Sequence, residues 1–280
     1  MLQLLLPLPR LIGLFLFVCA GLLPRLLQAQ IPPTFDMAAR VMHLTEGTLP
    51  RPQAVAVDAA GNSYVAGFIH GTIQFGDTII GAVSSGQVYI ARIGVRGSHD
   101  WIVVLNTVND NYNNNNSREL HQTSLAVDAN GNILVVNHFT SPTLTLGSIK
   151  LTKTEVFGNM FVARLSPNGK WLSAFTVGDA APSSITLDAG GNAYITGQYS
   201  LPITFGTTTL PFSGRSDFFV ACLAANNTWR WAVSGGGTSD DVANNISLDA
   251  QGHAYLVGYM VEGASSARSA CQLLGHSLPN

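Results

Sequence analysis

The sequence predicts an all-β fold built from repeats, and three observations lead to this prediction. A short segment of the form apolar-Asp-Ala-x-Gly recurs four times along the 280 residues. Apolar residues alternate with small or polar residues beside each copy, which is the period of a β-strand. Beyond the N-terminal region, the chain lacks convincing helical periodicity. These features together predict a series of β-hairpins.

The recurring segment reads as a hairpin turn. Its aspartates stand at 58, 128, 188 and 249, at spacings of 70, 60 and 61 residues, and the longer first interval holds an Asn-rich insertion at 109–116. The Asp carboxylate can accept backbone N–H groups, and the Gly can take the positive φ that closes the loop. The residues expected to build these structural turns are Asp58, Gly61, Asn62, Asp128, Gly131, Asn132, Asp188, Gly191, Asn192, Asp249 and Gly252.

More of the unit repeats beyond this hairpin. A Phe-Gly or Leu-Gly pair follows, then a strand such as 161–165, and then a strand that opens with Trp101, Trp171 or Trp229. Four strands joined as a meander make one blade of a β-propeller. The predicted fold class is therefore a β-propeller with four-stranded blades of about sixty residues. Within a repeat region at 31–263, we place blades at about 52–110, 121–178 and 182–235, with a partial fourth at 245–260.

Over about residues 35–260, these units resemble the bacterial SBBP-type β-propeller repeats. The resemblance lies in the Val-Asp-x-x-Gly-Asn-x-Tyr-Val-x-Gly hairpin, the Phe-Gly element, the Phe-Val-Ala-Lys-Leu strand and the Trp strand. The sequence departs from this pattern at Asn137, at His253 in place of Asn, and at Cys222 in place of Lys or Arg. The resemblance implies an exported bacterial protein of a family whose members mostly lack an assigned activity.

The repeat is incomplete at its C-terminal end, and the tail at 264–280 matches nothing in it. In one interpretation, which we favour, the chain is a fragment of a longer propeller. In the other, a strand at Phe35–His43 completes the fourth blade and closes a small ring, with a third strand supplied around 270–273. A fragment would leave an open blade face, which would favour self-association.

The N-terminus predicts export. An apolar run at Leu11–Leu23 precedes Leu-Leu-Gln-Ala-Gln, which is typical of a signal peptide over 1–29 with cleavage near Ala29. A retained membrane anchor is the alternative, although the run is short for a span of about 20 residues. Cys222 and Cys271 then remain in the exported chain and permit one disulfide. We favour none, because Cys222 falls in a predicted buried strand.

Composition and motifs exclude several function classes. Charged residues make up 11% of the chain, with a net charge of −2, so a nucleic-acid partner is not expected. Each turn aspartate offers one carboxylate, too few for calcium. Asp240-Asp241 could bind a cation weakly, but a solvated loop is the favoured interpretation. The histidines lack zinc-ligand spacing, and the Trp set favours packing between blades over sugar stacking. We therefore assign no catalytic residue, metal or cofactor.

The leading functional hypothesis is a secreted or cell-surface, non-catalytic interaction module that binds an unknown protein or glycan. One alternative is a secreted carbohydrate-active enzyme, a lyase or hydrolase, with its site at the mouth of the central channel. The other is a truncated fragment of a longer propeller without a function of its own.

Overall fold

The computed structural model describes residues 42–43, 51–69, 71–81, 87–107, 122–261 and 268–270. The chain divides into the units Met1–Ala38 and Ala39–Asn280, and all described residues belong to the second, which is considered by itself. The described residues form strands, turns and bends, which confirms the predicted all-β class. No helix among them could span a membrane. The predicted signal peptide at 1–29, the Asn-rich insertion and Cys271 lie outside the described residues.

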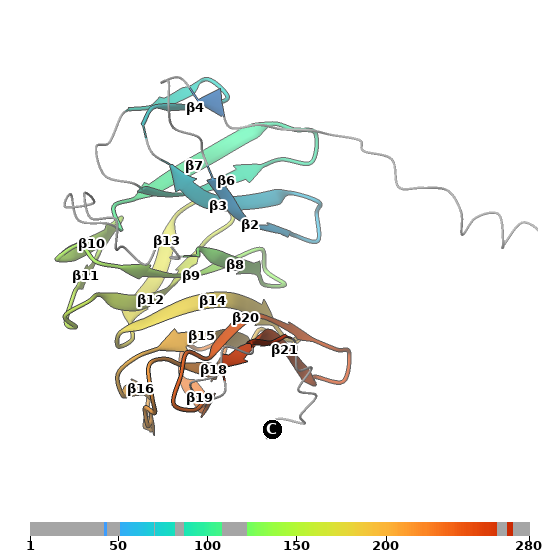
Figure 1. Cartoon of the computed structure of the whole chain (residues 1–280). Helices are drawn as coiled ribbons and strands as arrows, with labels where there is room; N and C mark the ends of the chain where they lie inside the picture. The colour runs from blue at the N-terminus through green and yellow to red at the C-terminus, as the bar shows by residue number, and fades with distance from the viewer. Residues whose placement is uncertain are drawn as a thin grey trace, which may run out of the picture. The chain divides into compact units, whose positions relative to one another are not determined.

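Three repeats each form a four-stranded antiparallel sheet (Figure 1). In each of these sheets, the strands pair in chain order. The recurring hairpin turn connects the first strand to the second. The first repeat contains β2 (Arg51–Val57), β3 (Ser63–Ile69), β6 (Gln87–Ile93) and β7 (His99–Leu105). The second contains β8 (Ser124–Val127), β9 (Ile133–Phe139), β12 (Asn159–Leu165) and β13 (Trp171–Thr176). The third contains β14 (Ala180–Leu187), β15 (Ala193–Tyr199), β18 (Asp217–Leu223) and β19 (Trp229–Gly235).

Each of these three repeats also carries a small hairpin between its second and third strands, which the sequence analysis did not predict and which lies outside the four-stranded sheet. The hairpins are β4 (Ile73–Phe75) with β5 (Thr78–Ile80), β10 (Thr143–Leu146) with β11 (Ile149–Thr152), and β16 (Ile203–Phe205) with β17 (Thr208–Leu210). The Phe-Gly or Leu-Gly pair makes the turn. Gly76, Gly147 and Gly206 have φ values of 57°, 61° and 62°, which suit the first position of a two-residue loop.

The fourth repeat is a three-stranded sheet of β20 (Val242–Leu248), β21 (Ala254–Val261) and β22 (Arg268–Ala270). Tail residues thus supply a third strand, two residues earlier than the sequence suggested. The other end differs from the ring-closing interpretation. Strand β1 (Met42–His43) pairs with β4 of the first repeat, and not with the fourth repeat. In the described part of the chain, the fourth sheet therefore receives no strand from the N-terminal side.

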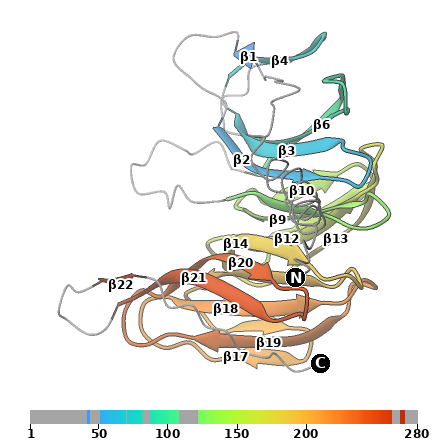
Figure 2. The ribbon, with the colours of Figure 1, turned by 90° about the vertical axis from the view of Figure 1, so that its right-hand side faces the viewer.

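The first strands of successive repeats contact one another in the order β2, β8, β14, β20 (Figure 2). Polar contacts join some of them, and each involves a Ser side chain four residues before a turn Asp. The Ile185 N–H donates to Ser124 Oγ at 3.2 Å, and Ser184 Oγ donates to Asn245 Oδ1 at 2.7 Å. Both contacts link residues 61 positions apart. The sequence repeat is therefore also a repeat of the interface between sheets.

Apolar side chains fill the space between successive sheets. One cluster joins the first and second repeats through residues such as Tyr64, Leu125 and Val135. A larger cluster joins the second and third repeats, and a smaller one joins the third and fourth. The hydrophobic core is thus divided into layers, each shared by two neighbouring repeats.

Candidate functional site

The recurring aspartates hold the hairpin turns through their carboxylates. Asp58 Oδ1 accepts the N–H groups of Ala60 and Asn62 at 3.0 and 2.9 Å. Its Oδ2 accepts Asn62 Nδ2 at 2.8 Å and the Tyr64 hydroxyl at 3.1 Å. Desolvation acts to raise the pKa of Asp58, but these hydrogen bonds outweigh it and hold the pKa below its ordinary value. The carboxylate is thus occupied within its own turn.

The other three turns repeat this arrangement with different additional partners. Asn132 donates a backbone and a side-chain hydrogen bond to Asp128, and Asn192 donates the same two bonds to Asp188. In the fourth turn, His253 Nδ1 lies 2.8 Å from Asp249 Oδ2 and replaces the Asn side chain. The turn glycines Gly61, Gly131, Gly191 and Gly252 have φ values of 86°, 77°, 77° and 84°. The structure therefore places all eleven predicted turn residues in local hairpin turns, one set in each repeat.

The turns differ in the residue of the third strand that lies beside the turn Asp. In the second repeat this residue is Arg164. Arg164 Nη1 lies 2.8 Å from Asp128 Oδ2, and both side chains are largely buried. Cys222 occupies this position in the third repeat and is a free, buried thiol. Desolvation raises its pKa, so the thiol stays neutral and the third turn has no equivalent ion pair from this strand.

The tryptophans pack between and within sheets. The Trp101 indole N–H donates to the carbonyl of Pro167 in the second repeat at 2.9 Å. Trp229 meets Phe175 edge to face, with ring centroids 6.2 Å apart, across the second and third repeats. Trp231 packs against Tyr194 in the same sheet. All four tryptophans are half-buried, so these contacts fit packing rather than a sugar-stacking array.

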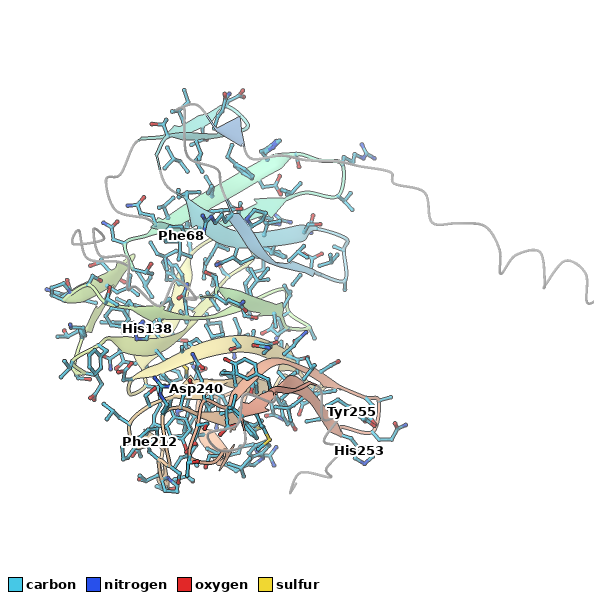
Figure 3. The ribbon with its side chains drawn as sticks, viewed as in Figure 1. Phe68, His138, Phe212, Asp240, His253 and Tyr255 are labelled. Carbon is cyan, nitrogen blue, oxygen red and sulfur yellow. The ribbon has the colours of Figure 1, made fainter. Side chains whose placement is uncertain are left out.

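No group of three or more His, Cys, Asp or Glu side chains gathers around a common point within the described residues. Apart from His253 in the fourth turn, His138 is a histidine with an acidic partner, and its Nε2 lies 3.3 Å from Asp179 Oδ1 (Figure 3). His138 is buried between β9 and the start of β14. The imidazole of this pair is buried, whereas that of His253 is 44% exposed.

The first repeat presents an exposed apolar surface, Val55 and Val57 on β2, which we call the leading face. Val55 is 67% exposed. Its equivalents, which also stand three residues before the turn Asp, are Leu125, Ile185 and Ile246, with exposures of 5%, 6% and 4%. Those three residues are covered by the preceding repeat. On the same side of this sheet, Tyr89 and Ala91 of β6 are buried in a cluster with β4, so the open part is confined to β2. The leading face is thus the part of an inter-repeat contact surface on which no described repeat lies.

The fourth repeat presents the opposite surface, Tyr255 and Val257 on β21, which we call the trailing face (Figure 3). Tyr255 is 38% exposed, whereas its equivalent Tyr64 is fully buried against the second repeat. Both tyrosines donate to their turn aspartate at 3.1 Å, so local geometry does not explain the difference. No sheet formed by the described residues covers the trailing face.

Two buried carboxylates meet at one end of the third repeat, and we call Asp217, Asp241 and the adjoining Gly236 the acidic corner. Asp217 and Asp241 are 4% and 1% exposed, so the interpretation of Asp240-Asp241 as a solvated loop is wrong for Asp241. Asp240 is half-exposed and lies 4.0 Å from the Arg215 guanidinium (Figure 3). Asp241 instead accepts the N–H groups of Gly237 and Val261, which draw it inward.

The sequence predicted an open blade face for the fragment interpretation, without naming its residues, and it did not predict the acidic corner. One signal for the corner was available: Asp217 opens the third strand where the second repeat has Asn159. The open faces follow from the end of the repeat series, but their exposure depends on neighbours that the local pattern does not specify.

No protein-family model and no curated protein sequence matches this chain. A similar solved structure is that of a catalytically inactive virginiamycin B lyase from Staphylococcus aureus with quinupristin. It shares 11% identity and a TM-score of 0.22 over 78% of this chain and 96% of that chain. A likeness at that TM-score supports no conclusion about the chemistry of this protein.

Proposed function

We propose that this chain is an exported, non-catalytic β-propeller repeat protein of the SBBP-like type that works as an interaction module. The observation that carries the proposal is the contrast between Val55 and its buried equivalents Leu125, Ile185 and Ile246. The leading face of the first repeat, whose equivalents in later repeats pack against the preceding sheet, is exposed. The trailing face of the fourth repeat, whose equivalents in earlier repeats pack against the following sheet, is also exposed.

The repeated interface favours another copy of this chain as the partner. Within the chain, the face that contains Leu125 packs against the face that contains Tyr64, and this pairing recurs between later repeats. The leading face and the trailing face are the two halves of that same interface. Head-to-tail pairing of two copies would therefore reuse a contact that the sequence already encodes three times.

The absence of clustered chemistry among the described residues supports a binding role over catalysis. The turn aspartates are held in their hairpins, and His138 is buried beside Asp179. Repeat proteins commonly use stacked sheets as extended interaction surfaces. An exported location follows from the apolar segment at Leu11–Leu23, and N-terminal sequencing of the secreted product tests it by the expected start near residue 30.

Native mass spectrometry of the full exported chain tests the self-association. We expect oligomers of the wild type whose proportion rises with protein concentration. Val55→Asp should yield monomers, because a buried carboxylate without a partner is costly at an apolar interface. Leu172→Asp is the matched control, since Leu172 is also exposed but lies on the last strand of the second repeat. A wild type that stays monomeric, or equal loss in both variants, would contradict the proposal.

A further inference from the structure

The acidic corner contains an unusual polar group. Asp217 Oδ2 accepts the Ser213 N–H at 2.8 Å. Its Oδ1 is fully buried and receives no hydrogen bond from any described residue. A buried ionised oxygen without a partner is among the most costly groups in a folded protein. The fold therefore either neutralises this oxygen or supplies a ligand for it.

The second carboxylate of the corner faces the same point. A Cβ atom on Gly236 would lie 3.0 Å from Asp241 Oδ2 and would collide with Asp217 Oδ1. Both oxygens thus lie against the Gly236 backbone, at a position that any side chain on residue 236 would displace. Gly236 has a φ of 156°, a conformation that residues with side chains rarely adopt. The glycine therefore lets both carboxylates approach this point.

The corner also lacks a positive charge. Among the ion pairs of the described residues, none includes Asp217 or Asp241. Arg215 is exposed and approaches only Asp240. Two buried carboxylates that share one space repel each other, and a bridging water would not cancel their charge.

The second repeat shows how the same corner is satisfied without charge. Asn159 occupies the position of Asp217, and its Nδ2 donates to the Val177 carbonyl at 3.0 Å and to Thr154 Oγ1 at 2.9 Å. Its Oδ1 accepts two loop N–H groups, from Thr154 and Glu155. In the third repeat, an acceptor oxygen replaces this donor. With Asp in place of Asn, a buried oxygen is left without a hydrogen-bond donor, and a cation or a proton would neutralise it.

We propose that the acidic corner binds a calcium ion between Asp217 and Asp241. Calcium takes carboxylate and backbone carbonyl oxygens, and water completes its coordination. With two carboxylates, the affinity should fall in the range of extracellular modules, with a Kd of about 10⁻⁴–10⁻³ M. This site is independent of the leading and trailing faces, so it can fail or hold separately from the proposed self-association.

Thermal unfolding of the full chain in EDTA and in about 10 mM calcium tests the site. We expect calcium to raise the Tm of the wild type by about 3–6 °C. Asp217→Asn, which copies the second repeat, should abolish this rise and should increase the Tm in EDTA. Asp240→Asn removes the neighbouring exposed carboxylate and should respond like the wild type. Magnesium at the same concentration should give a smaller rise.

Terbium luminescence gives a direct readout of binding. Tyr199 lies opposite Asp217 in the β15–β18 register, which places an aromatic sensitiser beside the site. We expect sensitised emission from the wild type and from Asp240→Asn, displaced by calcium, and none from Asp217→Asn or Asp241→Asn. A wild type whose Tm ignores calcium would show that the carboxylates share a proton or a water. A calcium response that persists in Asp217→Asn would place the ion elsewhere and overturn the proposal.

Discussion

Ile185 and Val55 occupy the same position in two repeats, three residues before the turn Asp, yet one is buried and the other is open. Both lie on the first strand of a sheet with the same hairpin geometry and the same bulge two or three residues earlier. Ile185 is covered by the second repeat, whereas no described repeat covers Val55. The comparison teaches that the hairpin is encoded locally, while burial is decided by the neighbouring repeat.

The largest expected effect is on stability at the interface between repeats. Ile185→Ala should lower the free energy of unfolding by about 2–5 kcal/mol, because it leaves a cavity between two sheets. Val55→Ala, at the equivalent exposed position, should change it by less than about 0.5 kcal/mol in the monomer. Urea unfolding of both variants at low protein concentration measures the difference. Equal losses would mean that Val55 is covered in the monomer, as a closed ring would require.

The turns give an intermediate effect that separates the second repeat from the third. Asp128→Ala removes the turn acceptor and also leaves the largely buried Arg164 without its carboxylate. We expect a loss of about 2–3 kcal/mol. Asp188→Ala removes an equivalent turn acceptor but no such ion pair, and should cost about 1 kcal/mol. Denaturant unfolding measures both changes. If the two variants lose the same stability, the Arg164 ion pair contributes nothing measurable.

The smallest effect concerns the exposed turn of the fourth repeat and its dependence on pH. Desolvation acts to raise the pKa of Asp249, but hydrogen bonds from His253, Tyr255 and Gln251 outweigh it and lower the pKa to about 2. Because the folded pKa lies below the ordinary value of 3.8, the stabilisation is present above pH 3.8 and is lost as the pH falls through about 2.

Asp249→Ala should therefore have a lower Tm than the wild type at neutral pH, and the difference should shrink as the solution is acidified towards pH 2. Thermal unfolding followed by circular dichroism across this range measures the trend. Gln251→Ala is a suitable control, because it keeps the backbone N–H that Asp249 accepts. A Tm difference that is constant with pH would show that the carboxylate charge is not what stabilises the turn.

The local parts of this structure could be predicted from the sequence, and the long-range parts could not. Asp58, Gly61 and Asn62 act within five consecutive residues, so the turn is legible from their order alone. The separate hairpin after β3 was missed because Phe75-Gly76 looked like a link rather than a turn between two short strands. Both the Asp58 turn and the separate hairpin depend only on residues close in the chain.

The acidic corner was missed for a different physical reason. Asp217 and Asp241 are 24 positions apart, and each belongs to a polar segment that resembles an ordinary surface loop. Asp241 stands just before β20 and accepts the N–H of Val261 at the end of the paired strand β21, a contact between residues 20 positions apart within the fourth repeat. Burial that is set by tertiary contacts overrides the polar appearance of the local sequence.

The most direct test of the central claim is a mixing experiment on the two open faces. Val55→Asp blocks the leading face and Val257→Asp blocks the trailing face, so neither variant alone can pair head to tail. Sedimentation velocity should show monomers for each variant and a one-to-one dimer when they are mixed, because one intact face of each kind remains. If Val257→Asp alone assembles like the wild type, or if the mixture stays monomeric, the repeats do not pair through these faces and the account is wrong.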